Sequence, residues 1–195
     1  MTGVEIDLLQ KTAKSRTSNL ILCGIFSALI ALGAFIKIPI PFVPFTLQFL
    51  FTSLAGLLLG PRLGSLAVGV YIGIGLLGIP VFTNGGGFGY IVQPTFGYLL
   101  GFYVGTYATG TIATASHTPS FWRLLLANFA GLLLVYLIGM IYYYVIANYY
   151  INQPLGVWAL TLYCFLLPIP GDLAICLSSA LLAKRLIPIF KKGVQ

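Results

Sequence analysis

The stretch LLLANFAGLLLVYLIGMIYYYVIA, residues Leu124–Ala147, contains 24 residues and no charged side chain. A helix needs about 20 predominantly apolar residues to cross the hydrocarbon core of a bilayer. Five further apolar segments accompany it along the chain: Leu20–Ile36, Phe45–Leu59, Gly64–Val81, Pro94–Thr114 and Val157–Ile187. The sequence therefore predicts an all-α membrane protein with six transmembrane helices.

Charged residues are scarce throughout the chain. Only 7% of the 195 residues are charged and 59% are hydrophobic, whereas an ordinary soluble domain is about 25% charged. The six apolar segments leave no room for a folded aqueous domain. We expect a cytoplasmic N-terminal tail over residues 1–19, a transmembrane substrate-binding domain over residues 20–187 and a basic cytoplasmic tail over residues 188–195.

The basic residues gather on one side of the predicted bundle. With six spans, nine of the ten Lys and Arg residues lie on the side of the termini, and Lys37 alone lies on the other. Cytoplasmic loops carry an excess of Lys and Arg, so we expect both termini in the cytoplasm of a multi-pass cell-membrane protein. The net charge of +7 then needs no nucleic-acid partner to explain it.

Two segments on the predicted outer face cannot form regular helices. Residues 37–44, KIPIPFVP, contain three prolines in eight residues, and proline lacks an N–H and holds its predecessor extended. Residues 83–89, TNGGGFG, are rich enough in glycine to let the backbone approach a ligand, or they form a simple flexible loop. The chain contains no GxxxxGK[ST] pattern, so these glycines are not the phosphate loop of an ATPase.

Asp172 is the most informative residue in the sequence. It is the only acidic residue after Asp7, and it follows the proline-glycine break of residues 168–171 inside an apolar segment. An ionisable side chain at membrane depth is costly and marks a functional site by default. The alternative is a structural carboxylate that caps the broken helix.

Other polar side chains are expected to line a pocket on the same outer side. Gln48 and Gln93 lie near the outer ends of two predicted spans, beside Thr46 and Tyr90, and the Asn84 amide offers both a donor and an acceptor. Such groups would be costly if they faced lipid. Ordinary hydrogen bonding between helices would satisfy them as well.

Neither a metal site nor an enzyme is predicted. The only histidine, His117, has no cysteine or acid at metal-ligand spacing, and the chain offers no paired carboxylates. An intramembrane enzyme would have to work almost entirely with Asp172. A channel would need a charged ring at a constriction, which the charge-poor spans lack. We therefore expect no catalytic activity, no metal and no cofactor.

Three stretches resemble a known family. They are PFTLQFLFTSLAGLLLGPRLGSLAVGVYIGIGLLGIPVF (residues 44–82), GGGFGYIVQPTFGYLLGF (85–102) and PGDL (170–173). They are similar to the biotin-specific substrate-binding components, or S-components, of energy-coupling factor (ECF) vitamin transporters. The resemblance implies a six-helix bundle that holds biotin in an outward-facing pocket. It also implies separate partners, one transmembrane coupling subunit and two ATPase subunits. An S-component for another vitamin is the nearest alternative.

The resemblance also implies which residues bind the substrate and the partner. The substrate-binding positions are Thr46, Gln48, Asn84, Gly86, Tyr90, Gln93 and Asp172. The first span carries small residues at helical spacing, which allow another helix to approach closely, and the resemblance implies that they contact the coupling subunit. These residues are Gly24, Ser27, Ala28 and Ala31. Internal packing is the alternative use of such residues.

Biotin has a ureido head, an apolar bicyclic ring system and a carboxylate tail. Asp172 and Asn84 are expected to bind the ureido head, while aromatic side chains pack against the rings. Many members of the family carry a lysine three residues after the aspartate, where this chain has Ile175. Lys37 either pairs with the carboxylate tail or anchors the chain at the membrane interface.

Overall fold

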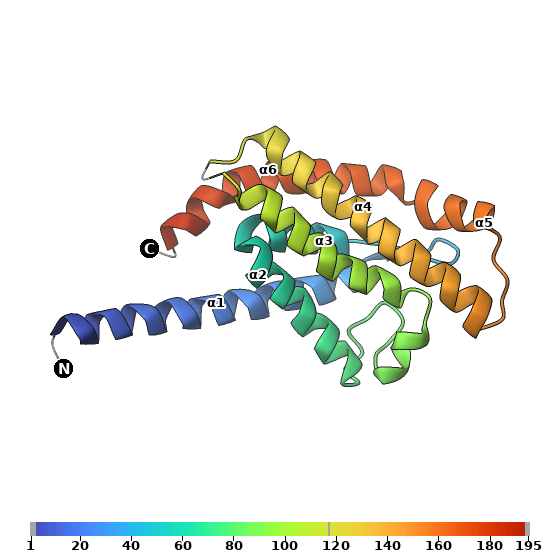
Figure 1. The fold of residues 1–195 in the computed structure, drawn as a ribbon, viewed down its shortest axis with the longest axis horizontal. Coiled ribbons are helices and arrows are strands. Elements are labelled where there is room, and N and C mark those ends of the chain that lie inside the picture. Colours follow the sequence, from blue (N-terminus) through green and yellow to red (C-terminus); the bar gives the residue numbers. More distant parts are fainter. Residues whose placement is uncertain (1–2, 117, 194–195) are drawn as a thin grey trace.

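The computed structural model describes residues 3–116 and 118–193, and this part of the chain is almost entirely helical (Figure 1). The main helices are α1 (Gly3–Phe35), α2 (Gln48–Leu76), α3 (Phe96–Thr114), α4 (Phe121–Val145), α5 (Val157–Thr161) and α6 (Ile169–Gly193). A 3-10 turn, η1 (Phe88–Val92), precedes α3, and two π-helical turns, η2 (Ile146–Tyr150) and η3 (Leu162–Leu166), follow α4 and α5. His117 lies outside the described residues.

Several helical segments are long and apolar enough to cross a membrane. The four described segments that qualify are Arg16–Phe35, Gln48–Leu76, Phe121–Tyr150 and Val157–Phe190. Large apolar side chains cover their outer surfaces: on α4, Leu133, Leu137 and Ile141 follow one another at every fourth position and are all exposed. Exposed apolar faces of this length suit contact with lipid rather than with water. The expected all-α membrane protein is confirmed at this level.

The helix α2 is broken at Gly60, between the two apolar segments Phe45–Leu59 and Gly64–Val81 that were expected to form separate spans. Gly60 has φ 81° and ψ −178°, a conformation that glycine adopts at little cost and other residues rarely adopt. A Cβ atom placed on Gly64 would lie 2.7 Å from the carbonyl oxygen of Ala55. In a continuous helix these residues would be about 13 Å apart along the axis, so the two arms of α2 fold back against each other.

The helix α1 is longer than the apolar segment within it. It begins at Gly3 and runs without a break to Phe35, so residues 3–19 and the first predicted span form one continuous helix. It ends just before the proline-rich segment, where Ile38 precedes Pro39 and is held extended. Residues 36–47 then cross the bundle as an irregular loop with two short strands, which agrees with the extended conformation expected there.

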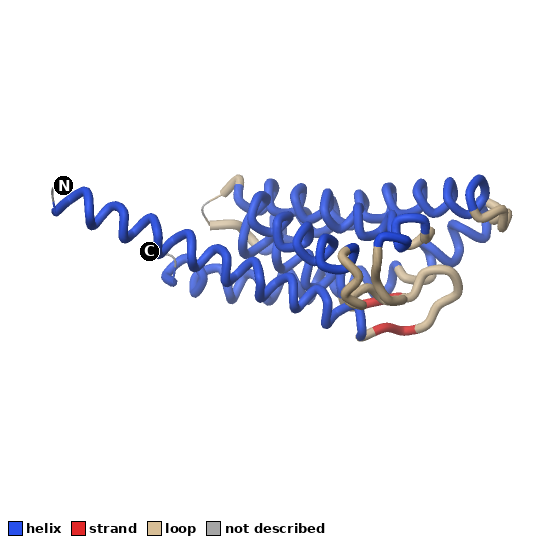
Figure 2. Tube along the Cα trace, turned by 90° about the horizontal axis from the view of Figure 1, so that it is seen from below, coloured by secondary structure: helices blue, strands red, loops and turns tan. Residues whose placement is uncertain are grey.

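Most of the irregular segments gather at one end of the bundle, and the described parts of the two terminal helices lie toward the other (Figure 2). We call these the loop end and the terminal end. At the loop end, the strands β1 (Lys37–Ile38) and β2 (Phe45–Thr46) pair antiparallel, with Lys37 opposite Thr46. A tight turn with Thr83 and Asn84 at its tip is closed by backbone hydrogen bonds between Phe82 and Gly85. These loops form one side of the cavity described next.

Candidate functional site

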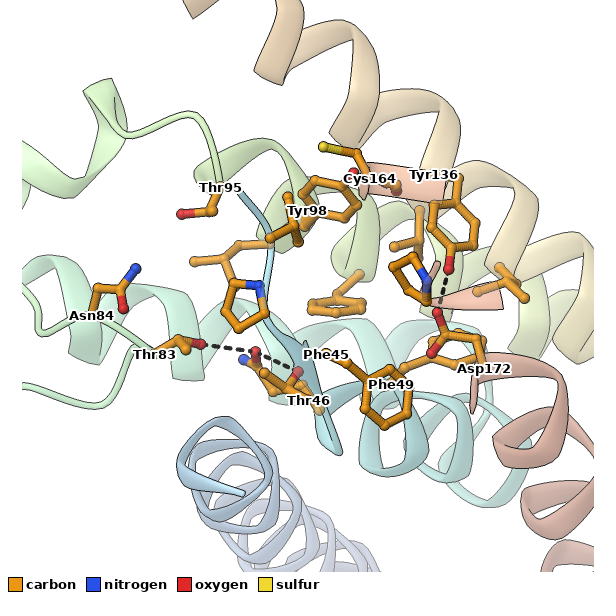
Figure 3. A pocket seen from close by; sticks show the side chains of 18 of the residues that line it. Phe45, Thr46, Phe49, Thr83, Asn84, Thr95, Tyr98, Tyr136, Cys164 and Asp172 are labelled. Carbon is orange, nitrogen blue, oxygen red and sulfur yellow. Dashed lines mark hydrogen bonds between the residues drawn. The ribbon is translucent and has the colours of Figure 1, made fainter. Parts of the chain in front are cut away.

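A cavity lies at the loop end, enclosed by the 36–47 loop, the turn at residues 83–84 and the helices α2, α3, α4 and α6 (Figure 3). The empty space between its walls, the open mouth included, measures about 680 Å³. A second hollow, at the terminal end, has walls made mainly of leucines and other apolar residues, without any charged side chain. Only the first cavity combines apolar walls with converging polar groups and a buried acid.

Asp172 forms one end of this cavity. Its side chain is 8% exposed, and it lies in the first turn of α6, where the helix dipole favours a negative charge. The break at Pro168 and Pro170 starts this new helix at membrane depth and thereby points Asp172 into the cavity. The Tyr136 hydroxyl of α4 donates a hydrogen bond to the Asp172 Oδ2 atom. Within the described residues, no cation pairs with Asp172.

Tyr98 compensates for the backbone hydrogen bond that Pro168 cannot make. In a regular helix the N–H of residue 168 would donate to the carbonyl oxygen of Cys164, and proline has no N–H. The Tyr98 hydroxyl donates to that carbonyl oxygen instead, at 3.0 Å. A buried carbonyl without a partner is costly, so Tyr98 stabilises the interrupted helix on which Asp172 depends.

A hydrogen-bond network centred on Gln48 forms another wall. The Gln48 Nε2 atom donates to the Tyr71 hydroxyl at 2.8 Å, and that hydroxyl donates to the carbonyl oxygen of Val81 at 3.2 Å. The Gln48 Oε1 atom accepts from the hydroxyls of Thr46, at 3.2 Å, and Thr83, at 3.5 Å. Gln48 therefore joins α2 and β2 to the turn at residues 83–84 and fixes the two threonines beside the cavity.

The two polar ends of the cavity are separated by apolar walls. Figure 3 shows Thr83, Asn84 and Thr95 at one end and Tyr136 and Asp172 at the other, with aromatic rings between them. The rings and aliphatic groups of the middle section come from Phe45, Phe49, Tyr98, Leu99, Phe102, Leu132 and Val135. Asn84 and Asp172 therefore do not form one polar cluster.

Tyr90 completes the Asn84 end of the cavity. It lies in the 3-10 turn before α3 and is 4% exposed. Burial raises the pKa of its hydroxyl, and because a tyrosine hydroxyl is protonated at neutral pH even without such a shift, the group can donate a hydrogen bond. The Tyr90 ring also contacts Phe82, with centroids 4.5 Å apart, which packs the turn at residues 83–84 against the 3-10 turn η1.

Five of the seven predicted substrate-binding residues line the cavity. They are Thr46, Gln48, Asn84, Tyr90 and Asp172. Gly86 and Gln93 are not among the lining residues. A Cβ atom on Gly86 would lie 2.3 Å from the carbonyl oxygen of Ile79, so this glycine permits close packing within its own loop. The Gln93 N–H donates to the carbonyl oxygen of Tyr90 at 3.0 Å and ends the 3-10 turn.

Sequence reasoning missed several lining residues, of which Tyr136, Tyr98 and Thr83 matter most. The signal for Tyr136 was present, because a hydroxyl near the middle of an apolar span needs a partner. For Thr83 the signal was weaker, since a threonine in a glycine-rich loop has many ordinary uses.

The predicted contact residues of α1 divide between two faces. The Ser27 hydroxyl is buried and donates to the carbonyl oxygens of Cys23, at 2.8 Å, and Ala67, at 2.7 Å. Ala31 packs against the hydrophobic core. Gly24 and Ala28 are exposed, and a Cβ atom on Gly24 would meet nothing within 4 Å. Ser27 and Ala31 thus serve internal packing, and Gly24 and Ala28 remain open to another helix.

Comparisons with known proteins agree on one family. Residues 9–192 match the BioY family. A probable biotin transporter BioY of Lysinibacillus sphaericus is 45% identical over 177 residues, covering 91% of this chain and 90% of that protein. The biotin transporter BioY of Thermotoga maritima is 42% identical over 136 residues, covering 69% and 77%. A crystal structure of the S-component for biotin from an ECF-type ABC transporter superposes with a TM-score of 0.74 and 25% identity, covering 95% of this chain and 94% of that one.

Proposed function

The chain belongs to the BioY family, and from this premise we propose that it is the biotin-binding S-component of an ECF-type vitamin transporter. It is a transporter component and not an enzyme, and it needs no cofactor. The observation that best supports biotin as the ligand is the cavity itself, with a buried carboxylate at one end, aromatic and aliphatic walls in the middle and neutral polar groups at the other end. Biotin carries complementary groups in this order along its length: a ureido head that donates hydrogen bonds, apolar rings, and a carboxylate tail that accepts hydrogen bonds.

In the proposed complex, the ureido N–H groups of biotin donate to the Asp172 carboxylate. One carboxylate oxygen already accepts from Tyr136, and an ionised carboxylate has about four acceptor positions in total, so acceptors remain for the ligand. The apolar rings of biotin then lie between Phe49, Phe102 and Leu132, which line the middle of the cavity. The valerate tail extends toward the Asn84 end.

The proposed membrane topology has six spans, with the two arms of α2 counted separately. Both termini are then cytoplasmic, residues 1–19 and 188–195 are the ends outside the 20–187 substrate-binding domain, and the loop end faces outward. The one-sided distribution of Lys and Arg supports this orientation. The cavity mouth then opens toward the outside of the cell, as a vitamin-uptake protein of the plasma membrane requires.

We further propose that transport depends on a coupling subunit and two ATPase subunits, since the chain carries no ATP-binding motif of its own. Gly24 and Ala28 provide the small-residue face that a helix of the coupling subunit would approach. A Gly24→Leu variant should fold and bind biotin normally, because the added side chain points into open space. It should lose co-purification with the coupling subunit, because the leucine holds the partner helix away.

The matched control is Gly73→Leu, since a Cβ atom on Gly73 also meets nothing within 4 Å. We expect Gly73→Leu to retain the coupling subunit. Retention of the subunit by Gly24→Leu at the wild-type level would show that this face of α1 is not the contact.

The proposed ligand is tested directly by binding. Protein purified in detergent without added vitamin should carry biotin, detectable by mass spectrometry after denaturation. Ligand-free protein should bind radiolabelled biotin at equilibrium, with excess thiamine or riboflavin unable to compete. Binding of thiamine or riboflavin with no biotin signal would instead identify an S-component for another vitamin.

A further inference from the structure

Lys37 has an unusual position among the charged residues of the described chain. It lies on β1 at the loop end, opposite Thr46 of β2, and Thr46 lines the cavity. The other described Lys and Arg residues lie on α1, at the turn of α2, at the start of α4 or on the second half of α6. Lys37 is therefore the one described cation beside the cavity.

The Lys37 ammonium is held at the mouth by the turn that lines the cavity. Its Nζ atom donates to the carbonyl oxygen of Thr83 at 2.9 Å, and both Thr83 and the adjacent Asn84 line the cavity. An ammonium group has three N–H donors, and this hydrogen bond uses one of them. The side chain is exposed, so the remaining donors face the mouth or solvent and are available to a ligand.

The charges at the two ends of the cavity have opposite signs. Among the described residues, Asp172 is the only ionisable acid that lines it, and its end of the cavity offers no cation that could pair with a ligand carboxylate. The Lys37 ammonium at the opposite end attracts a carboxylate. A ligand with a hydrogen-bond donor head and a carboxylate tail is thus favoured in a single orientation, with the tail at the mouth.

We propose that Lys37 binds the carboxylate of the ligand's tail and so makes the site selective for the free acid. This inference rests on biotin being the ligand, and it identifies the residue that recognises the tail. The carboxylate then bridges two segments that are distant in sequence, the strand β1 and the turn at residues 83–84. Lys37 is in this view a specificity-determining residue and not merely an interfacial anchor.

The test compares biotin with biotin amide, which has the same head and rings but a neutral tail. We expect wild-type protein to bind biotin about tenfold more tightly than the amide, since the charge-assisted hydrogen bond forms at an exposed mouth. Lys37→Gln keeps a donor for the Thr83 carbonyl but removes the charge. Lys37→Gln should bind biotin about tenfold more weakly than wild type does, and it should bind biotin amide as tightly as wild type does. Lys37→Arg keeps the charge and should retain most of the preference for biotin.

Binding of the amide also reports that each variant is folded with an intact cavity. Equal losses of affinity for biotin and for the amide in Lys37→Gln would overturn the proposal, because they would assign Lys37 to positioning the loop. Unchanged affinity for both ligands would overturn it as well, in favour of an anchoring role. Failure of the wild-type protein to bind either ligand would be a different result, which refutes biotin as the ligand and not only the role of Lys37.

Discussion

Replacing Asp172 with asparagine should weaken biotin binding by at least tenfold. The change preserves the volume of the side chain but removes its charge and replaces one oxygen with an NH₂ group. The Tyr136 hydroxyl donates to this side chain and would select the remaining amide oxygen as its acceptor. The NH₂ group would then face the ureido N–H of biotin, so that a donor meets a donor.

The size of the effect follows from the environment of the carboxylate. Asp172 is 8% exposed, so solvent screens its interactions only weakly. A hydrogen bond to a charged group contributes about 1.5–3 kcal/mol, and about 1.4 kcal/mol corresponds to a tenfold change in Kd. Loss of one such bond therefore raises the Kd for biotin by about 10-fold to 100-fold.

The measurement is equilibrium binding of radiolabelled biotin to protein in detergent, with thermal unfolding recorded in parallel to establish that each variant is folded. Asp7→Asn makes the same chemical change in the N-terminal part of α1 and should leave the Kd unchanged. If folded Asp172→Asn binds biotin within about twofold of wild type, a range below the weakest such hydrogen bond, Asp172 does not contact the head group. The assignment of the two cavity ends would then be wrong.

Two further predictions concern the packing around this site. Tyr98→Phe should lower the free energy of unfolding by about 1–3 kcal/mol, because the buried carbonyl oxygen of Cys164 loses its donor, and thermal or denaturant unfolding in detergent measures this loss. Gly171→Ala should speed biotin dissociation by about fivefold or more, measured by chase with unlabelled biotin. The added Cβ atom would lie 2.6 Å from a ring carbon of Phe45, and overpacking of this kind costs about 1–3 kcal/mol, which displaces the 36–47 loop from the mouth.

Each of these changes has a matched control in the same protein. Tyr103 lies on the same helix as Tyr98 but is 46% exposed, and Tyr103→Phe should leave the unfolding free energy nearly unchanged. Gly73→Ala adds a methyl group where nothing lies within 4 Å and should leave dissociation unchanged. If Tyr98→Phe and Tyr103→Phe lower the unfolding free energy equally, the contact of Tyr98 with Cys164 is wrong. If Gly171→Ala and Gly73→Ala speed biotin dissociation equally, the contact of Gly171 with Phe45 is wrong.

Much of the fold could be predicted from the sequence because the membrane imposes simple requirements. Apolar segments must be helical, since no water is present to satisfy their backbone groups. The sequence also indicates the break at Gly60-Pro61, because the conformational freedom of glycine and the missing N–H of proline favour a break there. The same two properties produce the break in the structure. Asp172 stood out because an acid at membrane depth is expensive.

The pairing of polar side chains could not be predicted in the same way. Membrane helices are apolar on every side, since lipid is as apolar as the protein interior, so the sequence gives little indication of which face of a helix points inward. Ser27 and Gly24 show the consequence: both are small residues on α1, yet Ser27 donates to the backbone of α2 and Gly24 is exposed.

The sequence by itself thus determined that the protein is a helical membrane protein of this family, with its only intramembrane acid at position 172. The tertiary structure alone decided that Tyr136, 36 residues earlier, bonds to that acid. It also placed Lys37 on the carbonyl oxygen of Thr83, 46 residues later, and Asn84 at the opposite end of the cavity from Asp172. The physical reason is that hydrogen bonds and charge pairs depend on distance in space, and only the packing of the helices sets that distance.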